Sequence, residues 1–196
     1  MKFEPVVLEG KHVRLEPLSR THHAGLCEVG LAAELWRWIP TPVQTPEEMT
    51  AYLELALKEH ANGVSLPFAQ IEKATGRVIG STRYMNIEKT HHRVEIGWTW
   101  IGREWQRTAV NTEAKYLLLR HAFETLGCMR VELKTDSLNE KSRAAILRIG
   151  AKEEGIFRNQ MITSSGRIRH TVYFSIVDSE WPGVKSRLEG KLNSDR

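Results

Sequence analysis

Cysteine is scarce in this chain of 196 residues. Only Cys27 and Cys128 are present, both in apolar surroundings and without CxxC spacing. The sequence therefore predicts two buried free thiols rather than a disulfide or a metal site. The adjacent His91 and His92 do not change this expectation, because neighbouring side chains in a strand point to opposite faces and no third ligand is nearby. We expect no metal.

Long apolar runs are also absent, and the chain shows no N-terminal signal pattern. A membrane-spanning helix requires about 20 consecutive apolar residues, so we expect a cytoplasmic protein without a membrane partner. A hydrophobic content of 41% over 196 residues is typical of one soluble domain with a substantial core. No repeat, linker or low-complexity tract divides the chain, which predicts a single domain over residues 1–196.

The chain has no strong excess of charge of one sign. Its net charge is +4, and the basic residues are interleaved with acidic ones. The only local concentration of cations lies within residues 158–170, where a solvated hairpin explains it as well as a partner does. Nucleic acid is therefore not the expected partner, and a polyanionic cofactor is a more economical explanation for a few clustered cations.

Glycine and lysine are missing from the loop at residues 106–111. A nucleoside triphosphatase loop would need Gly-Lys-Ser/Thr at this position, before the following helix. A dinucleotide-binding loop would need three spaced glycines, a pattern that Gly97 and Gly102 do not supply. These two classes of phosphate-binding loop are excluded.

The segment around this loop, residues 94–127, organises the chain. It begins with the alternation expected of a strand, breaks at Gly102, and resumes as a helix from about Thr112. The first amides of a helix lack partners and carry partial positive charge, so a loop that leads into them can bind an anion. Arg107 adds a guanidinium, while Asn111 and Thr112 can cap the helix or bind a phosphate oxygen. An ordinary connector explains these residues equally well.

The remaining pattern predicts alternating helices and strands. The helix at residues 21–35 ends in Trp36 and Trp38, which line an acceptor pocket or, as we favour, belong to the core or to a dimer contact. Residues 179–192 form an amphipathic tail that should dock on the body or on a second subunit. Strands are expected at residues 12–18, 66–72, 78–84, 94–101, 130–136, 153–161 and 167–177, and further helices at 45–60, 112–126 and 139–149.

Two motifs resemble those of the GNAT acetyltransferases. Gln106 matches the first position of that family's coenzyme A loop, Gln/Arg-x-x-Gly-x-Gly/Ala, although Ala109 and Asn111 replace its glycines. The second motif is Asn139-x-x-Ser142, in a helix that ends at Gly150. The resemblance covers residues 12–192 and is strongest to the branch of ribosomal-protein N-terminal alanine acetyltransferases.

The resemblance implies an α/β (α+β) fold with a central mixed, mostly antiparallel twisted sheet of about seven strands flanked by helices. It further implies an acetyltransferase that uses acetyl-CoA without a metal and acetylates a primary amine, a protein N-terminus or a small molecule, by direct attack. A homodimer or higher homo-oligomer is expected. Transfer of another acyl group, such as succinyl, and a coenzyme A-binding protein without turnover are the alternatives.

The resemblance also assigns roles to residues. It places the thioester between the strands at 94–101 and 130–136, with a bulge expected at Gly97, unless Gly97 only makes room for a tryptophan. Glu95 is the candidate base, unless it faces solvent, and Ser142 contacts the coenzyme sulfur. Asn139 and Ser142 are equally consistent with a plain helix cap. The residues expected to contact the coenzyme are Trp98, Thr99, Trp100, Gln106, Arg107, Thr108, Ala109, Val110, Asn111, Thr112, Asn139, Ser142 and Arg143.

Overall fold

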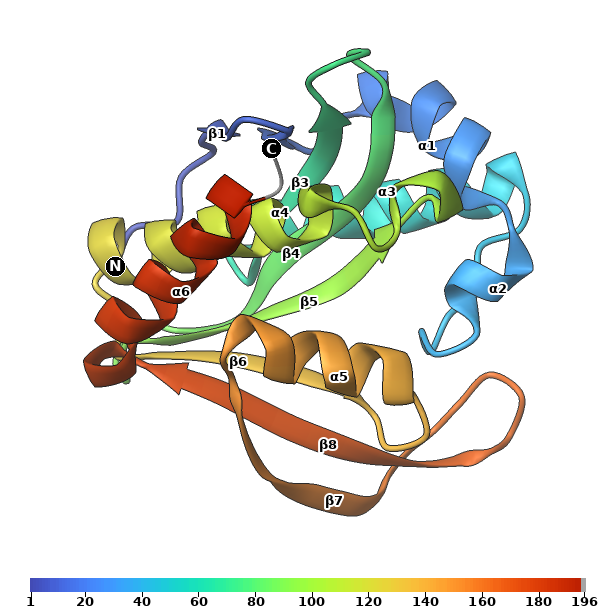
Figure 1. Cartoon of the computed structure of the whole chain (residues 1–196). Coiled ribbons are helices and arrows are strands. Elements are labelled where there is room, and N and C mark those ends of the chain that lie inside the picture. The colour runs from blue at the N-terminus through green and yellow to red at the C-terminus, as the bar shows by residue number, and fades with distance from the viewer. Residues whose placement is uncertain (195–196) are drawn as a thin grey trace.

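A single sheet of eight strands forms the centre of the computed structural model, which describes residues 1–194 (Figure 1). The last two residues of the predicted domain 1–196 lie outside the described part. The sheet has one strand more than the seven expected, because a short strand precedes the first predicted one. In chain order the strands are β1 (Leu8–Glu9), β2 (Val13–Pro17), β3 (Ser65–Glu72), β4 (Val78–Glu88), β5 (Arg93–Ile101), β6 (Arg130–Asp136), β7 (Lys152–Ile162) and β8 (Ile168–Val177).

The strands are arranged in the order β1-β2-β3-β4-β5-β6-β8-β7. Every neighbouring pair is antiparallel except β5 and β6, which run parallel. A parallel pair needs a crossover connection, and helix α4 provides it. The mixed, mostly antiparallel sheet that the resemblance implied is thus confirmed.

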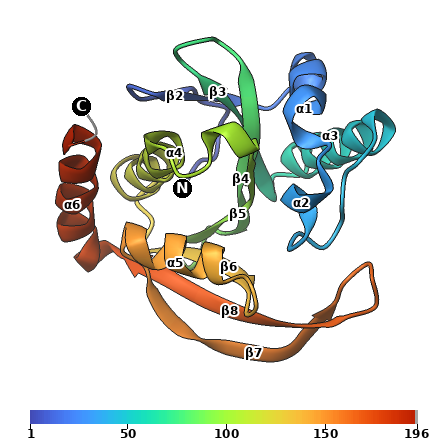
Figure 2. The same cartoon turned by 45° about the vertical axis from the view of Figure 1, so that its right-hand side comes forward.

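Helices cover both faces of the sheet. Their bounds are α1 (His23–Gly30), α2 (Ala33–Trp36), α3 (Pro46–Ala61), α4 (Ala109–Arg120), α5 (Glu140–Ile149) and α6 (Trp181–Ser194). Figure 2 shows α4 and α6 on one side of strands β3–β5 and α1, α2 and α3 on the other. Two separate apolar cores result, one beneath α4 and α6 and one beneath α1 and α3.

The helix predicted over residues 21–35 is interrupted. It divides into α1 and α2 because the Trp36 indole donates to the carbonyl oxygen of Gly30 over 2.6 Å and so satisfies the end of α1. Trp36 is buried and packs on Tyr52 and Trp100. The interpretation as a core residue is therefore confirmed for Trp36, but it is wrong for Trp38, which is half-buried and lines a pocket.

Strands β5 and β6 pair only at their beginnings. Their register joins Arg93–Glu95 of β5 to residues 130–132 of β6. From Ile96 onward β5 has no partner in β6 among the described residues, although β6 continues to pair with β8 as far as Asp136. The edge of β5 that faces β6 is therefore open over its second half.

A bulge in β5 accompanies this separation. The register with β4 shifts between Ser81 and Arg83, and Trp98 takes a left-handed φ of 48°. The predicted bulge position, Gly97, was therefore wrong by one residue, since Gly97 still pairs with Arg83. A Cβ on Gly97 would lie 2.6 Å from Met85 Sδ. Gly97 thus leaves room for a methionine, not for a tryptophan.

Helix α4 begins at Ala109, three residues before the predicted start. Thr108 is the cap: its Oγ1 accepts from the amide of Val110 over 3.4 Å and donates to the carbonyl of Trp105 over 2.8 Å. The chain enters the helix through a left-handed Arg107, with φ 65°. Asn111 therefore does not cap the helix, and its backbone is not left-handed.

Glu113 anchors α4 to the first strands. Its buried carboxylate accepts the backbone amides of Lys11, His12 and Val13 at 2.6–2.8 Å. On another side of α4, Tyr116 packs on Trp181 of α6, and its hydroxyl donates to Glu189 of the same helix over 2.6 Å. These contacts fix the helix, and with it the loop at its N-terminus, over the open end of β5.

Candidate active site

Glu95, the predicted base, lies at the centre of the candidate site. Its side chain is 1% exposed, so the alternative in which it faces solvent is wrong. Its neighbours Val94 and Ile96 point into the core beneath α4, so Glu95 lies on the opposite face, toward α1–α3. Lys134 Nζ lies 3.0 Å from its carboxylate and Asn86 Nδ2 donates to it over 2.8 Å. A carboxylate held in this way can accept a proton from a substrate on this face.

A second charged cluster lies further along β6 on the same face. The buried Asp136 forms ion pairs with Arg167 and with Arg169, whose Nε is 3.9 Å away. Arg169 Nη1 also donates to the carbonyl of Trp38 over 3.2 Å, which ties β8 to the loop after α2. Burial lowers the pKa of Arg169, and the charge of Asp136 opposes this effect. Nothing in the sequence indicated that these three residues meet.

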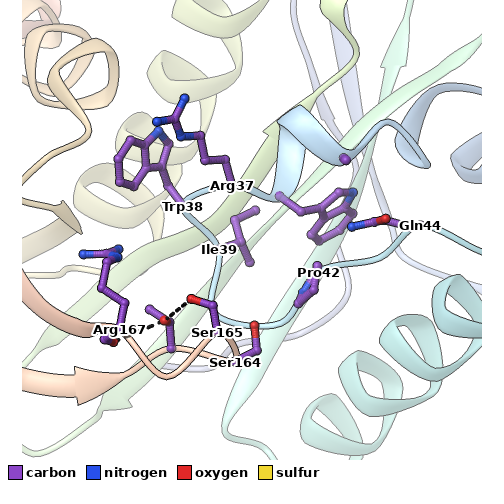
Figure 3. Close-up of a pocket in the computed structure, with 11 residues that line it drawn as sticks. Arg37, Trp38, Ile39, Pro42, Gln44, Ser164, Ser165 and Arg167 are labelled. Carbon is purple, nitrogen blue, oxygen red and sulfur yellow. Dashed lines mark hydrogen bonds between the residues drawn. The ribbon is translucent and has the colours of Figure 1, made fainter.

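A pocket of about 190 Å³ lies between the loop after α2 and the β7–β8 turn. In Figure 3, Trp38 and Arg37 project from the loop, while Arg167, Ser164 and Ser165 come from the hairpin. The guanidinium carbons of Arg37 and Arg167 lie 5.0 and 5.7 Å from the centre of the Trp38 ring. No acidic side chain is among the described residues that line the pocket. The pocket is thus aromatic and positively charged.

The loop residues predicted to hold the coenzyme surround the start of α4. Gln106, Arg107 and Thr108 are exposed, and Gln106 Nε2 donates to the carbonyl of Ile101 over 3.2 Å. Val110 is buried in the core, and Trp100 is buried with its indole nitrogen 3.3 Å from the Tyr52 hydroxyl. Only the backbone groups of these last two residues remain for a ligand.

The three residues predicted on α5 lie at its N-terminus. Asn139 caps the helix, since its Oδ1 accepts from the amide of Ser142 over 3.1 Å. The cap interpretation is therefore correct, and the hydroxyl of the half-buried Ser142 is not part of that hydrogen bond. Arg143 contacts the carbonyl of Ser137 and the carboxylate of Glu153, each at 3.3 Å.

The arrangement fits an elongated anionic ligand. The parallel strands β5 and β6 are each followed by a helix, α4 and α5, so both helices begin at the same edge of the sheet. The start of α4 and Arg107 suit phosphate groups. The open edge of β5 offers backbone donors and acceptors to amide groups. Phosphates joined to an amide-containing arm are the chemistry of coenzyme A.

Lys115 is a buried charged residue beside the open part of β5 that the sequence analysis did not single out. It lies on α4 and is only 8% exposed, and its Nζ donates to Thr99 Oγ1 over 2.7 Å. Burial lowers its pKa from 10.5 to about 7. A signal was present in the sequence, because Lys115 follows Asn111 by four residues and therefore shares its helix face.

The described residues lack both a membrane-spanning helix and a metal-binding cluster. Within residues 1–194, no helix is both long and apolar enough to cross a membrane. No group of three or more His, Cys, Asp or Glu side chains in the same part of the chain is arranged to hold a metal ion. Both cysteines are free thiols, with Cys128 buried and Cys27 half-buried.

Comparisons with known proteins agree with this geometry. Residues 12–152 match the family described as "Acetyltransferase (GNAT) domain". YdaF of Bacillus subtilis (strain 168), provisionally named a ribosomal N-acetyltransferase, is 36% identical over 110 residues, which are 56% of this chain and 59% of YdaF. The match thus spans less than two thirds of that relative.

Solved structures extend the similarity to nearly the whole chain. A GCN5-related N-acetyltransferase from Brucella melitensis is 36% identical, with a TM-score of 0.90, and the match covers 96% of this chain and 86% of that one. A ribosomal-protein-S5-alanine acetyltransferase from Vibrio fischeri, at 19% identity and a TM-score of 0.74, shares the fold over 90% of this chain and 98% of its own.

Proposed function

The chain belongs to the GNAT family of acetyltransferases and is an acyltransferase; on this premise we propose that it transfers an acetyl group from acetyl-CoA to a primary amine by direct attack. One observation carries the proposal. Beyond Glu95, β5 separates from β6 and leaves an open strand edge, with the buried carboxylate on one face of the sheet and the start of α4 on the other. This divides the site into an acceptor side and a coenzyme side.

Acetyl-CoA would supply an activated carbonyl and a thiol leaving group with a pKa of roughly 8.5, which leaves readily as thiolate. Glu95 would accept the proton of the attacking amine, directly or through a water, in the orientation that Lys134 and Asn86 impose. The open backbone of β5 would donate to the developing oxyanion. The Ser142 hydroxyl would face the sulfur, and Asn139 would contact the pantetheine arm through its amide nitrogen.

Arg107 should contribute strongly to coenzyme affinity. Replacing Arg107 with alanine should weaken binding of acetyl-CoA by about tenfold or more, because a charge-assisted bond to phosphate is lost. Arg107→Gly is the matched variant, since it removes the same guanidinium while accommodating the left-handed backbone at φ 65°. Calorimetric titration should give equally weak binding for both variants. Full affinity in Arg107→Gly would show that only the backbone conformation matters.

We propose a peptide N-terminus as the acceptor, with its side chains entering the pocket beside Trp38. The name of YdaF supports this class of acceptor, and the positive lining favours an acidic side chain near the amine. Arg37→Glu should raise KM for peptides with an acidic second residue by about tenfold and leave KM for acetyl-CoA unchanged. Equal effects on acidic and neutral peptides would contradict the assignment.

We also propose a homodimer in the cytoplasm. Strand β7 is at the edge of the sheet and exposes Ile156, Phe157 and Ile162. An edge strand with apolar side chains is suited to pairing with a second copy about a two-fold axis. Light scattering should give twice the chain mass of 22.4 kDa, and Phe157→Lys should lower it. A wild-type protein with the mass of one chain would refute the dimer.

The proposed reaction is tested by thiol release. The protein is incubated with acetyl-CoA and a panel of N-terminal peptides and small amines, and free thiol is measured together with the mass of each acceptor. The proposal predicts thiol release that depends on the acceptor, with a mass gain of one acetyl group. Succinyl-CoA in place of acetyl-CoA tests the other acyl group. Release with no acceptor across the panel would contradict acetyl transfer to an amine.

A further inference from the structure

We propose that the Lys115 ammonium or amine group is a catalytic hydrogen-bond donor, which binds the acyl carbonyl oxygen of the coenzyme thioester next to Thr99. The inference rests on the proposed function, because it assumes that acetyl-CoA binds along the open edge of β5. It goes further in assigning part of the oxyanion stabilisation to a side chain of the central helix.

The first step in the argument is the position of Thr99. Thr99 lies directly after the bulged Trp98, in the part of β5 that no longer pairs with β6. Its hydroxyl is 2.7 Å from Lys115 Nζ and 2.8 Å from Thr82 Oγ1 on β4. The two threonines therefore hold the lysine nitrogen at the open strand segment, four residues beyond the proposed base Glu95.

The second step is the direction in which Lys115 leaves α4. Glu113 points toward Lys11–Val13, at the far side of the sheet from β6. Successive residues of an α-helix are about 100° apart, so Lys115 leaves the helix on nearly the opposite side from Glu113. That side also carries Asn111, one turn closer to the loop of Arg107. Lys115 thus continues the coenzyme-facing side of α4 toward the centre of the site.

The third step concerns unused hydrogen-bonding capacity. A protonated lysine has three N–H donors, and Thr99 is the one acceptor that Lys115 contacts among the described residues. Within residues 1–194, Lys115 forms no ion pair with a carboxylate, and burial alone accounts for its lowered pKa. A buried cation is costly unless it is paired, and an apolar side chain would fill the same space without this cost. The remaining donors are therefore available to a ligand.

The chemistry matches what the site requires. Negative charge develops on the carbonyl oxygen when an amine attacks a thioester, and a donor fixed in a dry site stabilises that charge strongly. Burial lowers the pKa of Lys115 to about 7, so both protonation states are populated near neutral pH, and both retain N–H donors. Thr99 would orient the lysine, while Lys115 itself would contact the acyl oxygen.

The test compares acetyl-CoA with free coenzyme A, which lacks the acyl carbonyl. Calorimetric titration of Lys115→Met should show about tenfold weaker binding of acetyl-CoA and unchanged binding of coenzyme A. In steady-state assays its kcat should fall by about 10²-fold, as expected for the loss of an oxyanion donor. Thr99→Val should act in the same direction with a smaller effect. The exposed Lys58→Met on α3 serves as the control and should match wild type.

The outcomes separate this inference from the proposed function. If Lys115→Met weakens both ligands equally, or neither, the assignment to the acyl carbonyl is wrong even though the coenzyme binds. If wild-type protein binds neither ligand, the proposed function itself fails. Thermal denaturation of each variant shows whether it is folded, and Thr99→Val decides the question if Lys115→Met does not fold.

Discussion

Replacing Glu95 with glutamine should lower kcat by about 10²- to 10³-fold, the range expected when a general base is lost. The amide has nearly the same shape as the carboxylate, so the hydrogen bond from Asn86 can persist while proton acceptance is abolished. Acetyl-CoA should bind with unchanged affinity, because Glu95 lies on the face of β5 opposite α4. Steady-state kinetics together with calorimetry measure both quantities.

Glu132→Gln is the matched control for this prediction. Glu132 is the register partner of Glu95 on β6 and also accepts from cations, Arg93 and Arg130. Loss of an ion pair at this position should therefore change kcat by less than about threefold. If the two variants lose activity equally, the effect of Glu95→Gln reflects the structure of the β5–β6 pair, and Glu95 is not the base.

Lys115→Met should stabilise the protein against unfolding by about 3 kcal/mol at pH 7. Burial lowers the pKa of Lys115 from 10.5 to about 7. A pKa difference of this size between the unfolded and folded states lowers the free energy of unfolding by roughly 4 kcal/mol at neutral pH. Loss of the hydrogen bond to Thr99 offsets about 1 kcal/mol of this gain. A stability cost of this kind is expected if Lys115 has the proposed role, because active sites commonly trade stability for activity.

The pH dependence identifies the cause of this gain. Between pH 7 and pH 10.5 the unfolded lysine binds a proton that the folded lysine does not, so the wild-type protein gains stability as the pH rises. The destabilisation of the wild-type fold by the buried Lys115 is complete below pH 7 and disappears above pH 10.5. The advantage of Lys115→Met should therefore fall to about 1 kcal/mol at pH 9. Urea denaturation at pH 6, 7.5 and 9 tests this, and a gain independent of pH would mean that packing is responsible.

The sequence predicted the strands and helices well, because most of them have one buried face and hence a regular pattern. It did not fix the start of α4. Thr108, Asn111 and Thr112 are all suitable helix caps by residue type, and the choice among them depends on the left-handed turn at Arg107 and on the Trp105 carbonyl that binds Thr108. Such contacts exist only in the folded chain.

The site was predicted in part, mainly through its resemblance to a known family. The face on which Glu95 lies depends on the register of β5, and alternation alone leaves a buried acid and an exposed acid equally acceptable. Lys115 was missed because periodicity treats a lysine as an exposed residue, whereas this one is buried between α4 and Thr99. The meeting of Asp136, Arg167 and Arg169 depends on the pairing of β6 with β8.

Calorimetric titration of the wild-type protein with acetyl-CoA tests the central claim most directly, with ATP and NAD as control ligands. The proposed site predicts saturable one-to-one binding of acetyl-CoA, weakened by Arg107→Ala, and no comparable binding of NAD, which has phosphates but no pantetheine arm. Absence of acetyl-CoA binding, or equal binding of all three ligands, would contradict the assignment of a coenzyme site to α4 and the open edge of β5.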